Sequence, residues 1–340
     1  MLDHRSYARA VQEQPGNIDQ CELARVLREQ WGLASAELRY APVGFGDHHW
    51  ELTDTAGGRW FVTVAELSGG WRGTGPAAGY ADLRASMETV IALRQAGLEF
   101  AVAPVPTGLG QALAPLGAGH AITVFPHLDG AFGDWGDEMP ERDRLAVIDI
   151  LATLHNATPL ARRTARTRSP DLAGRPALEA ALGELSQPWG GGPYSEPARQ
   201  LLARHRHQLG RALARFDELV RETARSGPAV LTHGEPHPGN IMRSAGQLRL
   251  IDWDTVGLAL PERDLWIVAG AGTREADRYA GLTGHPVSAA ARHMYRMRWS
   301  LDDLTLCLGD FRGPHTQTED TGLAWTAFTE VIEAIGDLAR

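Results

Sequence analysis

Residues 231–254 read LTHGEPHPGNIMRSAGQLRLIDWD and concentrate polar and charged side chains between apolar segments. Such a density of polar groups is costly in a half-buried setting unless the groups are paired or bind a metal. Two prolines and a glycine at the centre of the stretch disfavour regular secondary structure there. The stretch therefore predicts a hairpin with a strand over 229–234, a polar loop, and a second strand over 247–254.

The polar loop and the strand ends carry residue types that suit metal and proton chemistry. In one interpretation, Asn240 and Asp252 hold Mg²⁺, which prefers oxygen ligands, and Glu235 orients or deprotonates a hydroxyl group. In a second interpretation, His233, His237 and Asp252 form the transition-metal site of a hydrolase. The spacing of the two histidines suits a helix, which the prolines exclude, so the first interpretation is favoured. Taken singly, either histidine also fits a buried, hydrogen-bonded support of the loop.

The rest of the chain divides into a strand-rich part and a helical part. Apolar spacing predicts helices over 20–32, 80–97, 141–157, 197–225 and most of 286–340. Short strand-like segments separated by glycine turns fill residues 35–125 outside the helix. We therefore predict an α+β fold. A β-rich lobe with one main helix, preceded by an N-terminal helix, joins a mostly helical lobe, and the cleft between them binds the ligand.

Composition excludes several classes of function. The chain of 340 residues has a net charge of −9, so it lacks the basic surface typical of nucleic-acid binding. All 33 basic residues are arginine. The two cysteines, Cys21 and Cys307, lie far apart in the sequence, which indicates a reducing compartment. Neither a signal peptide nor an apolar run long enough to cross a membrane is visible. We expect a cytoplasmic protein, monomeric or homodimeric, without nucleic-acid or membrane partners.

Two motifs carry a specific resemblance. HGEPHPGN (233–240) followed by LRLIDWD (248–254) resembles the aminoglycoside phosphotransferase family, whose pattern is H-G-D-x-H-x-x-N and then I-D-[FW]. Three further segments are similar to that family, namely LATLHNAT (151–158), VFPHLDG (124–130) and LPERDLW (260–266). Together these segments cover most of the chain and are far more specific than a lone glycine-rich turn.

The resemblance implies a protein-kinase-like fold. The N-lobe would comprise residues 1–124, the hinge 125–130 and the helical C-lobe 131–340. The implied activity is transfer of the γ-phosphoryl group of ATP or GTP, with Mg²⁺, to a hydroxyl group of a small molecule. A cationic antibiotic is one such acceptor, with a role in resistance or self-protection.

The resemblance also assigns roles within the catalytic loop. Glu235 occupies the position of the catalytic base, and Asn240 and Asp252 occupy the two Mg²⁺-ligand positions. His233 would support the loop, and Asp264 would tie the loop to the C-lobe.

On the nucleotide side, Gly44 and Gly46 would let the turn between the first two strands approach the phosphates, because glycine permits a close approach of the backbone. Thr63 occupies the position where the family has a phosphate-binding lysine. Arg59 and Arg72 are the candidates to replace that lysine. The hinge residues Val124, Phe125 and His127 would offer backbone groups to the adenine edge.

Two departures leave a rival interpretation open. Glu235 replaces the usual Asp, and Thr63 replaces the lysine, whose usual helix partner would here be Glu88 unless that side chain faces solvent. The rival is a kinase-fold protein that binds a small molecule without turnover. On the acceptor side, the candidate contacts of a cationic substrate are the acidic residues of the C-terminal helices, Asp302, Asp303, Asp310, Glu319 and Asp320.

Overall fold

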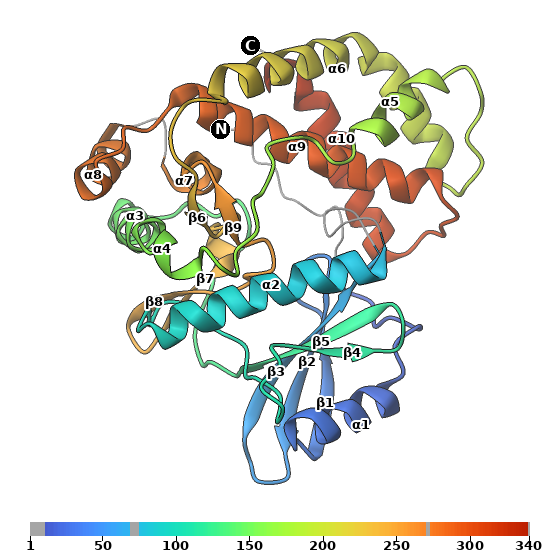
Figure 1. Ribbon diagram of the computed structural model, residues 1–340. Helices are drawn as coiled ribbons and strands as arrows, with labels where there is room; N and C mark the ends of the chain where they lie inside the picture. Colours follow the sequence, from blue (N-terminus) through green and yellow to red (C-terminus); the bar gives the residue numbers. More distant parts are fainter. Residues whose placement is uncertain (1–10, 69–74, 270–272, 339–340) are drawn as a thin grey trace.

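The computed structural model describes residues 11–68, 75–269 and 273–338 and shows two lobes (Figure 1). A five-stranded antiparallel sheet with two helices forms the first lobe, and helices dominate the second. The predicted α+β class and its division into a β-rich and a helical lobe are confirmed.

The sheet has the strand order β1-β2-β3-β5-β4. Its strands are β1 (Ser35–Ala41), β2 (His48–Asp54), β3 (Arg59–Glu66), β4 (Ala114–Leu116) and β5 (His120–Pro126). Alternation along the strands separates two faces. Trp50, Val62 and Val64 are fully buried on the face that packs with α1 (Gln20–Trp31), whereas Thr63 lies on the opposite face and is partly exposed. That opposite face is turned towards the helical lobe.

Helix α2 (Pro76–Gln95) lies between the sheet and the helical lobe (Figure 1). The helix begins before the predicted range because Pro76 suits the first helical position. Its buried residues Leu83, Met87 and Val90 share one core with residues of the helical lobe. Gly79 lies where α2 approaches the end of β3, since a Cβ atom there would be 2.2 Å from the carbonyl oxygen of Leu67.

We expect Gly79→Ala to destabilise the protein by about 1–3 kcal/mol, because the added methyl group must displace backbone rather than a flexible side chain. Urea denaturation of the two proteins measures the difference. Gly210→Ala is the matched control, because Gly210 is exposed in a helix and a Cβ atom added there would meet nothing within 4 Å. That control should be neutral or stabilising. Equal effects at both positions would contradict the close approach.

The helical lobe is built around three long helices that pack on one another, α6 (Ser195–Thr223), α9 (Ala289–Arg312) and α10 (Glu319–Leu338). Phe216, Phe311 and Phe328 are buried in their common core. The remaining helices of the lobe are α3 (Glu141–Asn156), α4 (Thr158–Ala161), α5 (Arg175–Gly183), α7 (Glu262–Val268) and α8 (Thr273–Thr283). Among the described residues, no helix is both long enough and apolar enough to cross a membrane.

The predicted hairpin over 229–254 is wrong in its pairing. Strand β6 (Val230–Thr232) pairs with β9 (Gly257–Ala259), while β7 (Ile241–Ser244) pairs with β8 (Gln247–Leu250). The physical reason is the Ala245–Gly246 turn, where both residues have a positive φ, of 49° and 77°. Such a two-residue turn closes a local hairpin. Because β8 is then paired with β7, β6 pairs with β9, further along the chain.

Backbone hydrogen bonds clamp the β7–β8 hairpin to both lobes. Leu250 donates to the Phe100 oxygen at 2.8 Å and accepts from the Val102 nitrogen at 3.1 Å. On the other strand, Arg243 and Ala131 exchange hydrogen bonds of 2.7 and 3.1 Å, just after β5 has crossed between the lobes. The hairpin therefore holds the segment that follows β8 at the junction of the lobes.

Candidate active site

His233 anchors the start of residues 233–240, which we call the catalytic loop after the role that the resemblance gives them. Its ring is buried and lies edge-on to Trp253, with ring centroids 4.6 Å apart. Nε2 lies 2.9 Å from the Ile251 carbonyl oxygen, so Nε2 carries the hydrogen and Nδ1 accepts from the Glu235 amide at 3.2 Å. Burial lowers the pKa of His233, which favours this neutral form. The ring thus connects the loop to the segment after β8.

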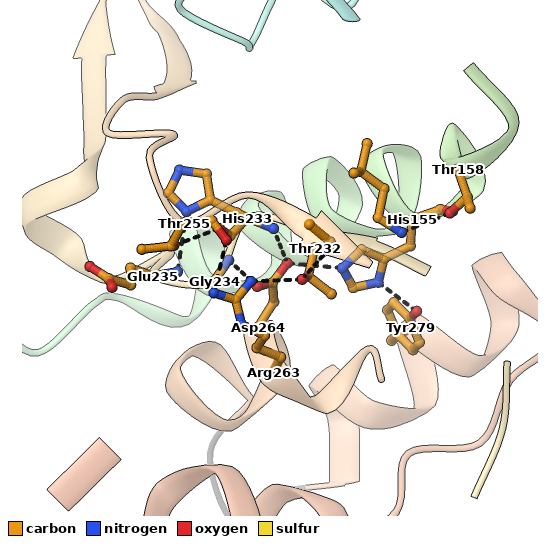
Figure 2. Close-up of polar contacts among 12 residues, drawn as sticks. His155, Thr158, Thr232, His233, Gly234, Glu235, Thr255, Arg263, Asp264 and Tyr279 are labelled. Atoms are coloured by element: carbon orange, nitrogen blue, oxygen red, sulfur yellow. Dashed lines mark hydrogen bonds and ion pairs between the residues drawn. The ribbon is translucent and has the colours of Figure 1, made fainter. Parts of the chain in front are cut away.

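Asp264 on α7 is the centre of a buried network below the loop (Figure 2). Its carboxylate accepts from the amides of His233, at 2.9 Å, and Gly234, at 2.6 Å. The Nε2 atom of His155 donates to the same carboxylate at 3.0 Å. Burial by itself raises the pKa of Asp264, but the hydrogen bond from His155 and the charge of Arg263 outweigh it, so the pKa lies below its usual value. Asp264 is therefore a buried anion that orients the loop backbone.

The same network explains the sequence LATLHNAT. His155 also contacts the Tyr279 hydroxyl through Nδ1 at 2.7 Å. Its carbonyl oxygen accepts from Thr158 Oγ1 at 2.6 Å, and that hydroxyl oxygen accepts from the Leu231 amide of β6 at 2.8 Å. His155 of α3 thus supports the anion below the loop, and Thr158 at the start of α4 supports the strand that leads into it.

The Asn240 side chain has a defined orientation. Its amide nitrogen donates to the Glu235 carbonyl oxygen at 3.0 Å and to Nε2 of His237 at 3.1 Å. Burial lowers the pKa of His237 to about 3, so the ring is neutral and Nε2 can accept this hydrogen bond. Because both amide hydrogens have partners, the amide oxygen is the atom left for a ligand.

Asp252 comes directly after Ile251, a residue that is hydrogen-bonded to the catalytic loop. The Ile251 amide donates to the Asn240 carbonyl oxygen at 3.1 Å, which brings the residue after it beside the catalytic loop. Asp252 is exposed and has a φ of 60°, a conformation that a non-glycine residue adopts at a cost. Glu235 is partly exposed, and Figure 2 shows its carboxylate pointing away from the buried network. The hydrogen bonds of Asn240 to Glu235 and of Ile251 to Asn240 therefore bring the backbone of Glu235, Asn240 and Ile251, the residue before Asp252, together.

The N-lobe residues predicted to meet the nucleotide lie around the sheet. Gly44 and Gly46 have φ values of 81° and 86°, in the left-handed region that favours glycine. Thr63 is on the sheet face turned towards the C-lobe, and Phe125 opposes Phe61 on the same sheet. Arg72 lies outside the described residues.

The hinge residues use part of their backbone hydrogen-bonding capacity in the sheet. Val124 is buried, and its carbonyl oxygen accepts from Val105 at 2.7 Å. The His127 amide donates to the Arg59 oxygen at 3.1 Å. The Arg59 guanidinium contacts Asp129 at 2.8 Å and the His127 ring at 3.0 Å, so it is held at the hinge rather than over the sheet.

The acid that α2 buries is Asp82 and not Glu88, the residue considered above as the helix partner of position 63. Glu88 is exposed and pairs with Arg84 one turn away, at 3.6 Å. The buried acid is Asp82, which pairs with Arg168 at 2.8 Å. Arg168 also donates to the Val256 carbonyl oxygen at 3.0 Å, so the pair joins α2 to the segment that follows Asp252.

The hydrolase interpretation finds no support in the geometry. Over residues 11–68, 75–269 and 273–338, no group of three or more His, Cys, Asp or Glu side chains could hold a metal ion. His233 and His237 instead use ring nitrogens within the loop, on Ile251, Glu235 and Asn240.

Comparison with known proteins decides the family. The family model described as the phosphotransferase enzyme family matches residues 37–315. The chain belongs to this phosphotransferase family. The resemblance predicted from the two motifs is thereby confirmed. A search of curated proteins gave no match.

Solved structures of small-molecule phosphotransferases share the fold. Spectinomycin phosphotransferase APH(9)-Ia, in complex with ADP and spectinomycin, has a TM-score of 0.71 and 14% identity and covers 95% of this chain and 98% of its own. Amicoumacin kinase hAmiN, with AMP-PNP and Ca²⁺, has a TM-score of 0.60 and 15% identity over 94% and 93%. Ethanolamine kinase of Plasmodium vivax has a TM-score of 0.54 and 12% identity over 94% and 90%.

The acidic residues predicted for the acceptor side of this phosphotransferase lie in different surroundings. Asp302 on α9 pairs with Arg298 at 3.2 Å, and burial raises its pKa to about 6. Asp303 is buried beside Cys307 in the helical core. Asp310, further along α9, is partly exposed, and its charge, like that of Asp303, adds to the effect of burial in raising the pKa of the Cys307 thiol. Glu319 and Asp320, at the start of α10, are bonded to the segment 12–13 that leads into the N-lobe.

Sequence reasoning missed an aromatic group beside the catalytic loop of the phosphotransferase. Trp135 stacks on Trp299 of α9, with centroids 4.6 Å apart and planes at 7°. The His237 ring meets Trp135 edge-on at 4.4 Å, and Trp266 of α7 packs against the pair. Isolated tryptophans at distant positions carry no local signal of such a cluster.

Because the resemblance gives Asn240 the role of a Mg²⁺ ligand, we expect His237→Phe to lower the affinity for Mg²⁺ in the presence of ATP by about tenfold or more, since groups that orient a metal ligand typically contribute that much. The phenyl ring keeps the packing on Trp135 but cannot accept from Asn240. Titration of Mg²⁺ at fixed ATP measures the effect. His207→Phe, at an exposed position of α6, is the control. An unchanged Mg²⁺ titration in His237→Phe would show that Asn240 needs no such orientation.

Proposed function

We propose that this protein transfers the γ-phosphoryl group of ATP or GTP, in the presence of Mg²⁺, to a hydroxyl group of a small molecule. One observation carries the proposal. The buried Asp264 holds the loop through the amides of His233 and Gly234, and a hydrogen bond from the Asn240 amide to the Glu235 carbonyl oxygen joins these two loop residues. The Ile251 amide donates to the Asn240 carbonyl oxygen, so Asp252 follows directly after a residue bonded to the loop. Membership of the phosphotransferase family supports the same chemistry.

The donor set fits Mg²⁺. The ion prefers a few oxygen ligands together with phosphate oxygens. Asn240 has an amide oxygen left for a ligand, because its amide nitrogen donates to Glu235 and His237, and Asp252 would supply a carboxylate. When bound, Mg²⁺ neutralises charge that develops on the phosphates during transfer. In this proposal Glu235 accepts a hydrogen bond from the acceptor hydroxyl and orients it. Glu235 keeps the carboxylate of the usual Asp, and phosphoryl transfer asks this group to orient the hydroxyl more than to act as a strong base.

The N-lobe would hold the nucleotide. Gly44 and Gly46 would cover the phosphates, and the backbone of the hinge residues Val124, Phe125 and His127 would face the adenine edge, in addition to the sheet contacts described above. Thr63 and Arg72 stay proposed phosphate contacts.

A cationic, hydroxylated acceptor is the class we favour. The net charge of −9 supports it, and two related structures bind spectinomycin and amicoumacin. The acids Asp302, Asp303, Glu319 and Asp320 stay its proposed contacts. Of the four acids, Asp302 is the best placed, because its side chain is 32% exposed and lies near the buried Arg263 below the loop.

Calorimetric titration with ATP and with GTP, each with and without Mg²⁺, tests the nucleotide half of the proposal. Mg²⁺-dependent binding is expected, and a screen of aminated and other hydroxylated antibiotics for phosphate transfer then tests the acceptor half. Failure of both nucleotides to bind would contradict the proposal. Nucleotide binding without transfer to any acceptor would instead favour the rival binding protein.

A further inference from the structure

The described strands of the N-lobe sheet place no arginine where it would meet phosphates. The chain contains no lysine. The two arginines of these strands, Arg39 and Arg59, are 67% and 52% exposed and pair with Glu51 and Asp129. Nucleotide phosphates need hydrogen-bond donors in a binding site, and a polar side chain of the sheet can supply one beside the glycine turn.

His49 and Thr63 form a cross-strand pair at the relevant position. They are directly opposed in the β2–β3 register, and His49 Nδ1 lies 3.1 Å from Thr63 Oγ1. The imidazole ring stacks on Phe61, with centroids 5.1 Å apart and planes at 28°. The stack and the hydrogen bond together fix which edge of the ring faces outwards.

The outward edge of the ring lies under the glycine turn. A Cβ atom on Gly44 would be 3.2 Å from Nε2 of His49, so that nitrogen is the part of the ring nearest the turn. His49, Phe61 and Thr63 are all partly exposed, and they lie on the face opposite to the buried Trp50 and Val62. The charge of the Asp254 carboxylate, which belongs to the C-lobe, favours the protonated form of His49 and so opposes the lowering of its pKa.

We propose that His49 and Thr63 together form the phosphate contact of the N-lobe, in place of the lysine that the family has at position 63. The inference rests on the proposed function, because it needs a nucleotide bound over this face of the sheet. The pair presents a donor in either tautomer. If Thr63 donates to Nδ1, then Nε2–H faces the phosphates, and if Nδ1–H donates to Thr63, the hydroxyl hydrogen faces them.

The pair should also couple nucleotide binding to pH. Burial and the neighbouring His48 lower the pKa of His49 to about 4, against the opposing effect of Asp254. An anionic phosphate beside Nε2 favours the imidazolium form, so the pKa of His49 rises when the nucleotide binds. Binding then takes up a proton, and affinity increases as pH falls.

The test compares ATP and adenosine binding by calorimetry in wild type, His49→Phe and Thr63→Val. His49→Phe keeps an aromatic ring on Phe61 but has no nitrogen. We expect about a tenfold or greater loss of ATP affinity in His49→Phe, since one charge-assisted hydrogen bond is removed, and no change for adenosine. His48→Gln is the matched control at about pH 8, where His49 of the free protein is neutral with or without His48, because His48 lies on the other face and contacts Tyr40 at 3.0 Å.

The pH dependence gives a second readout. The ratio of the ATP affinity of wild type to that of His49→Phe should increase as the pH is lowered from about 8 to about 6. Taking the ratio cancels the titration of ATP itself, which affects both proteins equally. An ATP affinity of His49→Phe within twofold of wild type, or an equal loss for adenosine, would overturn the inference and leave the proposed function standing. A wild-type protein that binds neither ATP nor GTP would instead overturn the proposed function.

Discussion

Asp252→Asn is expected to lower the rate of phosphoryl transfer by about a thousandfold, the effect of losing roughly 4 kcal/mol of transition-state stabilisation. The amide removes the negative charge of a proposed Mg²⁺ ligand while keeping its shape. Asparagine is the appropriate replacement because it tolerates the left-handed conformation that Asp252 adopts at a φ of 60°. Alanine there would add backbone strain to the chemical effect.

The fold should survive this change. Asp252 is exposed, and substitutions at exposed positions typically change stability by about 0.5 kcal/mol or less. Steady-state rates and urea denaturation of Asp252→Asn, each beside Asp277→Asn at an exposed position of α8, separate activity from stability. Asp252→Asn with more than about a tenth of wild-type activity would exclude the carboxylate as a metal ligand.

Asp264→Asn is expected to destabilise the protein by about 3–5 kcal/mol and to remove activity with it, because it breaks a buried charged network. The side chain is fully buried and accepts from two loop amides and from His155. Asparagine would turn an amide group towards one of these donors, which leaves that donor without an acceptor.

The contribution of Asp264 should depend on pH in one direction. Its pKa is lower in the folded state, so its stabilisation is present above the unfolded pKa of about 3.9 and is lost as pH falls through the folded pKa. Urea denaturation at neutral pH and in acid should therefore show that the difference in free energy of unfolding between wild type and Asp264→Asn is smaller in acid. A difference that does not change with pH would mean that the carboxylate charge is not the stabilising feature.

Much of the fold and of the catalytic loop could be predicted from local sequence. Helices α1, α3 and α6 lie within about two residues of their predicted bounds, because their apolar spacing and end signals are local. The loop 233–240 is likewise specified by its prolines and glycines. The pairing of β6 with β9 could not be predicted, since a strand of three residues carries no signal of its partner.

The arrangement around α2 and the sheet shows the same limit. Glu88 and Asp82 are both acids on one helix, and only the packing of α2 on the C-lobe buries Asp82 against Arg168. His49 reads in the sequence as one of two adjacent histidines on a strand, and the register with Thr63 distinguishes it from His48.

The family, the two lobes and the loop residues Glu235, Asn240 and Asp252 could be predicted, because they depend on motifs and periodicities within short segments. The groups that surround these residues depend on the packed fold. Contacts between residues far apart in the chain select Asp264 with His155, Trp135 with Trp299, and the strand register that opposes His49 to Thr63. Such contacts form only when separate elements pack, so no local pattern encodes them.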